Sequence, residues 1–165
     1  MYSKESYGKI RAWFLIKGYR LNLLKFVYKV LPIFVFIGYP LLLIYLIITG
    51  SGKLLQCITV PLGVFVSVTV LRKFINAARP YERLEIQPLM VKDTKGLSFP
   101  SRHTASSTVI AMTFLFVNIP LGIAFLIVAA LIGLSRIFAG VHFPRDVLAG
   151  FLYSVIMSAL FFFVL

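Results

Sequence analysis

The chain has 165 residues, of which 60% are hydrophobic and 13% charged, and 17 Lys and Arg against five Asp and Glu give a net charge of +12. Soluble domains are about 45–50% apolar and about 25% charged, so this composition argues against a soluble fold. In so apolar a chain, the positive charge indicates anionic lipid headgroups or phosphate as partners and argues against nucleic acid.

The first predicted element is a basic amphipathic helix. Between residues 9 and 30, apolar side chains recur at helical spacing opposite a basic face, which is typical of a helix lying in the membrane interface. A membrane span here would put Lys17, Arg20 and Lys25 in hydrocarbon, at about 2.5–3.5 kcal/mol each near its centre. We therefore expect residues 1–30 to be an interfacial anchor.

Five apolar segments follow, at about residues 31–49, 54–71, 104–119, 121–138 and 146–165. A span needs about 20 apolar residues, so the third and fourth are short, which leaves room for their ends to extend. The polar breaks at 49–53 and 118–120 predict tight turns between antiparallel helices. The predicted fold is all-α, a polytopic bundle of about five transmembrane helices plus the interfacial helix, in a single domain of residues 1–165.

Residues 72–102 form the single long polar segment. It contains Pro80, Pro88, Gly96 and Pro100, which predict a loop of about thirty residues, and loops of this length are usually functional or disordered. Tracing five spans alternately through the bilayer puts the N-terminal segment, this loop and the 135–146 turn on one side. Sixteen of the seventeen basic residues then share that side, and only Lys53 lies opposite.

Titratable side chains are scarce enough for their positions to be informative. The only histidines are His103 and His142, and the only acid after Asp93 is Asp146. Each lies at the end of a predicted span on the basic side, where a polar group is a functional candidate. A histidine can also be a buried structural residue, but the nearby acid and arginines favour a functional site.

Three local patterns contain these residues. They are Arg72, six residues, Arg79-Pro80; then Pro100-Ser101-Arg102-His103; then Ser135-Arg136, five residues, His142, three residues, Asp146. Their order and spacing resemble the three-part signature of the type 2 phosphatidic acid phosphatases (PAP2), a superfamily shared with vanadium haloperoxidases. The resemblance covers about residues 54–160, the expected family core, and Arg72 stands where the family motif usually begins with Lys. It implies metal-independent hydrolysis of a membrane-lipid phosphate through a phosphohistidine.

Phosphoryl transfer needs positive charge around the equatorial oxygens, an in-line nucleophile and a proton for the leaving group. We assign His142 as the nucleophile, because Asp146 four residues on can accept a hydrogen bond from one ring nitrogen and leave the other free to attack. Asp146 also steadies the cation that forms. His103 then acts as general acid for the leaving oxygen and as base for the water that follows.

The phosphate-binding residues implied by the resemblance and by the need for paired donors are Arg72, Arg79, Ser101 and Arg136. Ser101 is also expected to cap the helix that follows it. The remaining cations near the motifs are expected to be solvated or to face headgroups; they are Lys92, Lys95, Arg102 and Arg145. No metal and no cofactor are expected, because Asp146 is the only carboxylate near the two histidines.

The predicted substrate is a lipid phosphate of the phosphatidate, phosphatidylglycerol phosphate or polyprenyl diphosphate class. Two alternatives stay open, a vanadate-dependent haloperoxidase and a non-enzymatic protein that binds anionic lipid. The predicted location is the cell membrane, crossed several times. The positive-inside rule favours a cytoplasmic site, whereas familiar six-helix members of the family open outward.

Overall fold

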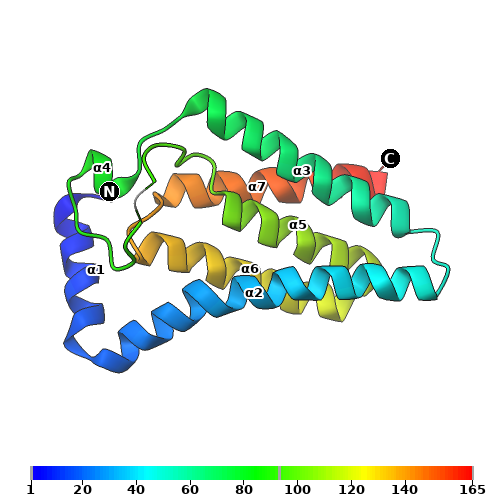
Figure 1. Cartoon of the computed structure of the whole chain (residues 1–165), viewed down its shortest axis with the longest axis horizontal. Coiled ribbons are helices and arrows are strands. Elements are labelled where there is room, and N and C mark those ends of the chain that lie inside the picture. Colours follow the sequence, from blue (N-terminus) through cyan, green and yellow to red (C-terminus); the bar gives the residue numbers. More distant parts are fainter. Residues whose placement is uncertain (1, 93, 165) are drawn as a thin grey trace.

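The computed structural model describes residues 2–92 and 94–164, and every regular element in these ranges is helical (Figure 1). In chain order the helices are α1 (Lys4–Ile16), α2 (Gly18–Ile48), α3 (Leu54–Ile75), α4 (Pro80–Arg83), α5 (Arg102–Val117), α6 (Ile119–Phe138), α7 (Pro144–Ala159) and the π-helix η1 (Leu160–Val164). The predicted all-α bundle is confirmed.

Helix α5 is the centre of the bundle. It packs against α2, α3, α6 and α7, and every residue from 104 to 114 is buried. At Gly122 a Cβ atom would lie 2.1 Å from the backbone of Leu115, so the absence of a side chain allows α6 to approach α5 closely. Much of this buried surface is hydroxyl-bearing, with Ser107 and Thr113 donating to carbonyls of their own helix.

Four helical stretches are long and apolar enough to cross a membrane; they are Gly18–Ile48, Leu54–Arg83, Ile119–Phe138 and Pro144–Val164. Their outer faces expose many large apolar side chains, as expected for contact with lipid. The 16-residue α5 is shorter and is enclosed by the others. The predicted set of about five spans therefore corresponds to four long apolar helices around one shorter buried helix.

The predicted boundary at residue 30 is wrong. Helix α1 ends at Ile16, Lys17 has an extended backbone, and α2 then continues without a break to Ile48. A 31-residue helix is about 46 Å long against a hydrocarbon core of about 30 Å, so its basic first turns can lie outside the apolar layer. Arg20 stacks at 4.0 Å on the ring of Trp13 and so stabilises the corner between α1 and α2.

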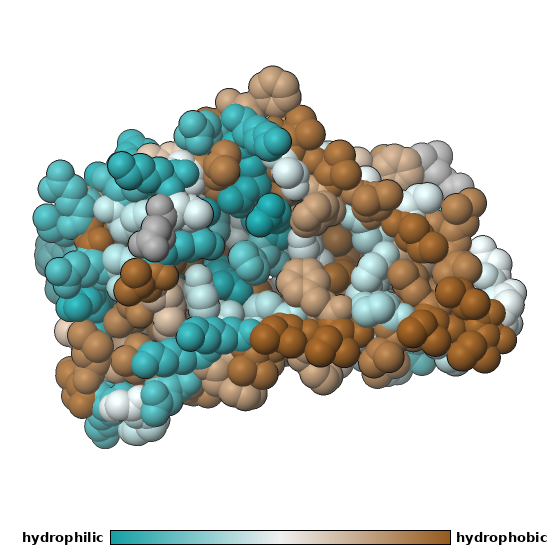
Figure 2. Space-filling view, in the orientation of Figure 1, coloured by the Kyte–Doolittle hydropathy of each residue, from teal (hydrophilic) through white to brown (hydrophobic). Residues whose placement is uncertain are grey.

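The two predicted tight turns are present at the far end of the bundle. Lys53 lies in the α2–α3 turn and donates through Nζ to the carbonyl of Phe116, while Asn118 caps α6 by accepting from the amide of Leu121. The opposite end is polar: hydrophilic side chains gather over α1, α4 and the neighbouring loop, whereas the remainder of the visible surface is largely hydrophobic (Figure 2).

The polar segment 72–102 is only partly a loop. Helix α3 extends to Ile75 and ends at Asn76 in a left-handed conformation, and the four-residue α4 follows. The loop from α4 to α5 is tied back to the bundle by long-range hydrogen bonds, from Ser98 N to Ala77 O and from Leu89 N to Ala139 O. The first bond holds the loop near the end of α3, and the second holds it against the end of α6, where the turn to α7 begins.

Candidate active site

His142 lies in the tight turn between α6 and α7, at the polar end of the bundle. The amides of Val141 and His142 both donate to Arg136 O, which fixes the path of the turn. Gly140 has φ +77, and a Cβ there would lie 2.6 Å from the hydroxyl of Tyr7, so glycine is required on both counts. The histidine that this turn presents is 1% exposed.

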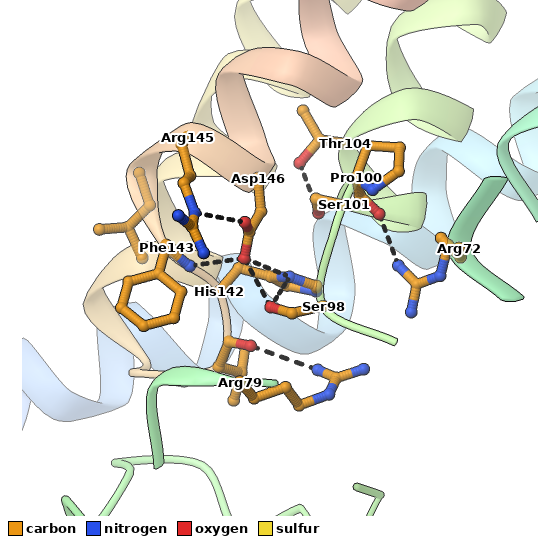
Figure 3. A network of polar contacts seen from close by, with 12 residues as sticks. Arg72, Arg79, Ser98, Pro100, Ser101, Thr104, His142, Phe143, Arg145 and Asp146 are labelled. Atoms are coloured by element: carbon orange, nitrogen blue, oxygen red, sulfur yellow. Dashed lines mark hydrogen bonds and ion pairs between the residues drawn. The ribbon is translucent and has the colours of Figure 1, made fainter. Parts of the chain in front are cut away.

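The imidazole faces Asp146 and a residue that the sequence analysis did not identify, Ser98 (Figure 3). His142 Nδ1 lies 3.7 Å from Asp146 Oδ2 and 3.4 Å from Ser98 Oγ. The Ser98 hydroxyl donates to the same carboxylate oxygen at 2.5 Å, and the Phe143 amide donates to it at 3.0 Å. One carboxylate oxygen thus orients the imidazole, the hydroxyl and the start of α7.

The second carboxylate oxygen of Asp146 has fewer contacts with polar groups than the first. Asp146 Oδ1 is buried without a hydrogen bond from any described residue, and Arg145 Nε lies 3.6 Å away. The Arg145 side chain is otherwise largely exposed, with its guanidinium 5.2 Å from the ring of Phe143. Arg145 therefore touches the carboxylate from outside and does not face the imidazole.

Ser101 connects the starts of α5 and α7. Its amide donates to Asp146 O at 2.8 Å, and a Cβ on Gly150 would lie 2.7 Å from Ser101 O, so α7 approaches this residue closely. Ser101 holds the cap position of α5, but its side chain makes no capping hydrogen bond and instead accepts from Thr104 Oγ1 at 2.9 Å. The predicted side-chain cap is therefore wrong.

Both histidines are uncharged at neutral pH. Burial, together with the charges of Arg136 and Lys92, lowers the pKa of His103 to about 3. Burial also lowers the pKa of His142 to about 4, although the neighbouring Asp146 carboxylate acts in the opposite direction. A neutral imidazole with one protonated nitrogen held by an acceptor is the form that attacks as a nucleophile.

Arg72 and Arg79 are buried cations without a carboxylate partner among the described residues. Arg72 is 7% exposed and donates to Pro100 O at 2.7 Å, and Arg79 is 3% exposed and donates to Gly96 O and Val141 O. Figure 3 shows both guanidinium groups on the side of the His142 ring that faces away from Asp146. Buried charges of this kind call for an anion between them.

Arg136 is also buried, but its guanidinium turns toward α2. Its Nη2 donates to Tyr28 O at 3.0 Å, and the group lies 3.8 Å from the centre of the Tyr28 ring. Its Nε is buried without a hydrogen-bond partner among the described residues, which leaves one donor free. Of the three predicted arginines, the structure brings Arg72 and Arg79 to the His142 ring and holds Arg136 against Tyr28.

The profile of the PAP2 superfamily matches residues 41–165. The chain belongs to this superfamily. The resemblance predicted from the three short patterns is thereby confirmed.

Two curated proteins are similar to parts of this PAP2 chain. It is 42% identical over 65 residues to the undecaprenyl-diphosphatase BcrC of Bacillus subtilis (strain 168), which is 39% of this chain and 34% of the relative. It is 34% identical over 103 residues to the bacitracin transport permease protein BcrC of Bacillus licheniformis, 60% of this chain and 50% of the relative. The chain thus spans about a third of the length of the first relative and about half of the length of the second.

Two solved structures share the PAP2 fold. Aquifex aeolicus LpxE superimposes with a TM-score of 0.63 at 30% identity, covering 86% of this chain and 93% of LpxE. The PAP2-type phosphatidylglycerolphosphate phosphatase from Bacillus subtilis superimposes with a TM-score of 0.61, covering 94% of this chain and 81% of that one. At 23% identity, the second likeness is evidence for the fold alone.

Lys92 is the least exposed of the cations that were expected to be solvated or to face headgroups in this PAP2 protein. It is half-buried, and burial together with Arg79, Arg136, Arg72 and Arg102 lowers its pKa to about 8. Lys92 is thus less accessible than Lys95 and Arg102, which are exposed, and the expectation that it is solvated or faces headgroups stays a prediction. Within residues 2–92 and 94–164, no group of three or more His, Cys, Asp or Glu is arranged to hold a metal ion.

We expect this PAP2 protein to lose stability as the pH falls from 7 toward 4. An unfolded histidine takes up its proton near pH 6.5, while folded His142 and His103 resist protonation until about pH 4 and 3. In this interval the unfolded state binds more protons, so each histidine lowers stability by up to about 1.4 kcal/mol per pH unit. As the pH is lowered, thermal midpoints in detergent should fall less steeply for His142→Gln and His103→Gln than for wild type. Slopes equal to that of wild type would contradict the lowered pKa values of the two histidines.

Proposed function

We propose that this chain is a membrane enzyme that hydrolyses a phosphate monoester or diphosphate carried by a lipid, without a metal ion, through a phosphohistidine on His142. The observation that carries the proposal is the pairing of a buried neutral imidazole, held by Asp146, with two buried arginines that have no carboxylate partner. Membership of the PAP2 superfamily supports the same chemistry.

In the first step, His142 Nε2 attacks the phosphorus while Arg72 and Arg79 neutralise its equatorial oxygens. A nitrogen–phosphorus bond forms, the bond between phosphorus and the lipid-side oxygen breaks, and the electron pair leaves on that oxygen. Asp146, with Ser98, keeps the proton on Nδ1 and stabilises the positive charge that develops on the ring.

In the second step, a water attacks the phosphohistidine and releases inorganic phosphate, which restores neutral His142. His103 is proposed to donate a proton to the leaving oxygen in the first step and to accept one from water in the second. In the empty site its pKa is about 3. The negative charge of a bound phosphate raises that pKa, so His103 takes up a proton from solvent when the substrate binds and donates it to the leaving oxygen in the first step.

The location of the site supports a lipid substrate. The chain is a multi-pass membrane protein, and its polar end lies where apolar helices give way to basic side chains. Headgroups of bilayer lipids reach this level while their chains stay in hydrocarbon. We propose that the basic end also attracts anionic lipid, and its excess of positive charge supports a cytoplasmic orientation.

The test is phosphate release from detergent-purified protein with a chelator present. The panel should contain phosphatidate, phosphatidylglycerol phosphate and a polyprenyl diphosphate, with the His142→Gln protein purified in parallel to control for contaminating phosphatases. We expect release from at least one lipid to survive the chelator. Release that requires added divalent metal, or vanadate-dependent halide oxidation in place of phosphate release, would overturn the proposal.

A further inference from the structure

The N-terminal helix α1 packs against the turn that carries His142. Figure 1 shows α1 running across the polar end of the bundle, at a steep angle to α2. Tyr7 makes the contact and is 1% exposed. A Cβ on Gly140 would lie 2.6 Å from its hydroxyl and 2.7 Å from its ring, so the tyrosine covers this glycine closely. Since Gly140 is two residues before His142, α1 touches the backbone that presents the imidazole.

The hydroxyl of Tyr7 joins three parts of the chain. It donates to Ala139 O at 3.3 Å and accepts from the Leu89 amide at 3.0 Å. The same Leu89 amide also donates to Ala139 O, at 3.0 Å. Helix α1, the loop between α4 and α5, and the end of α6 therefore meet at one buried hydroxyl group.

A second tyrosine of the N-terminal segment holds the same turn at its two ends. The hydroxyl of Tyr2 donates to Ile137 O at 3.0 Å, and its ring lies edge-on to that of Phe143, with the ring centres 5.7 Å apart. The rings of Tyr2 and Tyr7 are themselves 6.0 Å apart. The two tyrosines thus contact the turn before, at and after Gly140.

The position of this turn decides where the imidazole stands relative to a bound phosphate. Arg72 is anchored outside the turn, on Pro100 O, and Arg79 keeps a bond to Gly96 O that does not involve the turn. A small displacement of the turn would therefore move His142 while the phosphate stays with the arginines. Attack requires the reacting atoms to lie about 3–3.5 Å apart and in line, and a misplacement of about 1 Å can cost about 100-fold in rate.

The Tyr7 hydroxyl is not needed to satisfy the backbone around it. Because the Leu89 amide and Ala139 O are bonded to each other, neither is left without a partner when the hydroxyl is removed. A buried backbone group is costly chiefly when it is unpaired. Removal of the hydroxyl should therefore loosen the link between α1 and the turn while the fold remains stable, so the two effects can be measured separately.

We propose that Tyr7 is a positioning residue, through which α1 holds the His142 turn in place for attack on phosphorus. The inference rests on the proposed function and adds a residue that acts through the backbone of the same site. Helix α1 then belongs to the architecture of the active site, in addition to its expected contact with the membrane surface.

The experiment compares Tyr7→Phe with Tyr39→Phe. Both variants keep the ring and lose one hydroxyl that donates to a backbone carbonyl; for Tyr39 this is Cys57 O, at 2.8 Å, between α2 and α3. In Tyr7→Phe, kcat for the preferred lipid should fall about 10- to 100-fold while KM changes less than about threefold, because the phosphate-binding arginines keep their anchors. Tyr39→Phe should match wild type in both constants, and the thermal midpoints in detergent of the two variants should be similar.

Nitrogen NMR of selectively labelled histidine gives a second readout, since the chain has only two histidines. His142→Gln assigns the two sets of signals. Tyr7→Phe should shift or broaden those of His142 and leave those of His103 in place, whereas Tyr39→Phe should change neither.

Three results would overturn the role of Tyr7. They are a wild-type kcat in Tyr7→Phe, an equal loss of kcat in Tyr39→Phe, and His142 signals that do not respond to Tyr7→Phe. Failure of the proposed function is distinguishable, since wild type would then release phosphate from no lipid, while the NMR comparison would still show whether Tyr7 holds the turn.

Discussion

Replacing His142 by Gln should lower phosphate release by about 10⁴-fold or more, because loss of a nucleophile removes the covalent route rather than weakening it. Glutamine retains a polar group of similar size next to Asp146 and Ser98, so the buried carboxylate keeps a partner. Initial rates at saturating lipid, with thermal midpoints measured in parallel, separate catalytic loss from unfolding. A variant that is folded and retains more than a tenth of wild-type activity would exclude His142 as the nucleophile.

The covalent intermediate offers a positive readout of the same assignment. Rapid acid-free quenching of wild type with a substrate labelled in its terminal phosphate should trap a labelled protein that is stable to base and labile to acid, as a phosphohistidine is. The label should be absent from His142→Gln. In His103→Gln it should persist longer, because the water that releases it lacks its base.

The polar end of the site was predictable because titratable residues are rare in this chain. With two histidines and one acid beyond residue 93, the spacing predicted that His142 and Asp146 meet at the start of a helix. In the structure His142 Nδ1 lies 3.7 Å from Asp146 Oδ2. Ser98 was not predictable in the same way. It lies in a loop whose path depends on contacts such as Leu89 to Ala139, which no periodicity encodes.

The helical fold was predictable from apolar segments, but the end of the N-terminal amphipathic helix was not. The spacing of apolar and basic residues is the same whether the segment forms one helix or two, so it does not reveal the break at Lys17. That break accompanies packing of Tyr7 and Phe14 against Ala139, which is distant in the sequence. The enclosed position of α5 had a signal in the sequence, its many Ser and Thr residues. Small hydroxyl side chains favour contact between helices over contact with lipid.

Changing Asp146 to Asn should lower kcat by about 10²- to 10⁴-fold with little change in KM, as expected when an imidazole loses the acceptor that sets its tautomer. The amide oxygen can still accept from Ser98 Oγ and the Phe143 amide, so the start of α7 should remain folded. What disappears is the negative charge that stabilises the cationic ring during attack. Steady-state kinetics with the preferred lipid, and thermal midpoints, measure the two effects separately.

Ser98→Ala is the matched variant, because it removes a second group from the same carboxylate oxygen and leaves the charge in place. His142 Nδ1 lies 3.4 Å from Ser98 Oγ and 3.7 Å from Asp146 Oδ2, so the imidazole proton has two acceptors within reach. If the carboxylate accepts the imidazole proton directly during the reaction, Ser98→Ala should cost about tenfold, the low end for one hydrogen bond to a charged group. A loss as large as that of Asp146→Asn would instead indicate that Ser98 links the imidazole of His142 to the carboxylate of Asp146. Full activity in Asp146→Asn would show that the carboxylate orients the imidazole neither directly nor through Ser98.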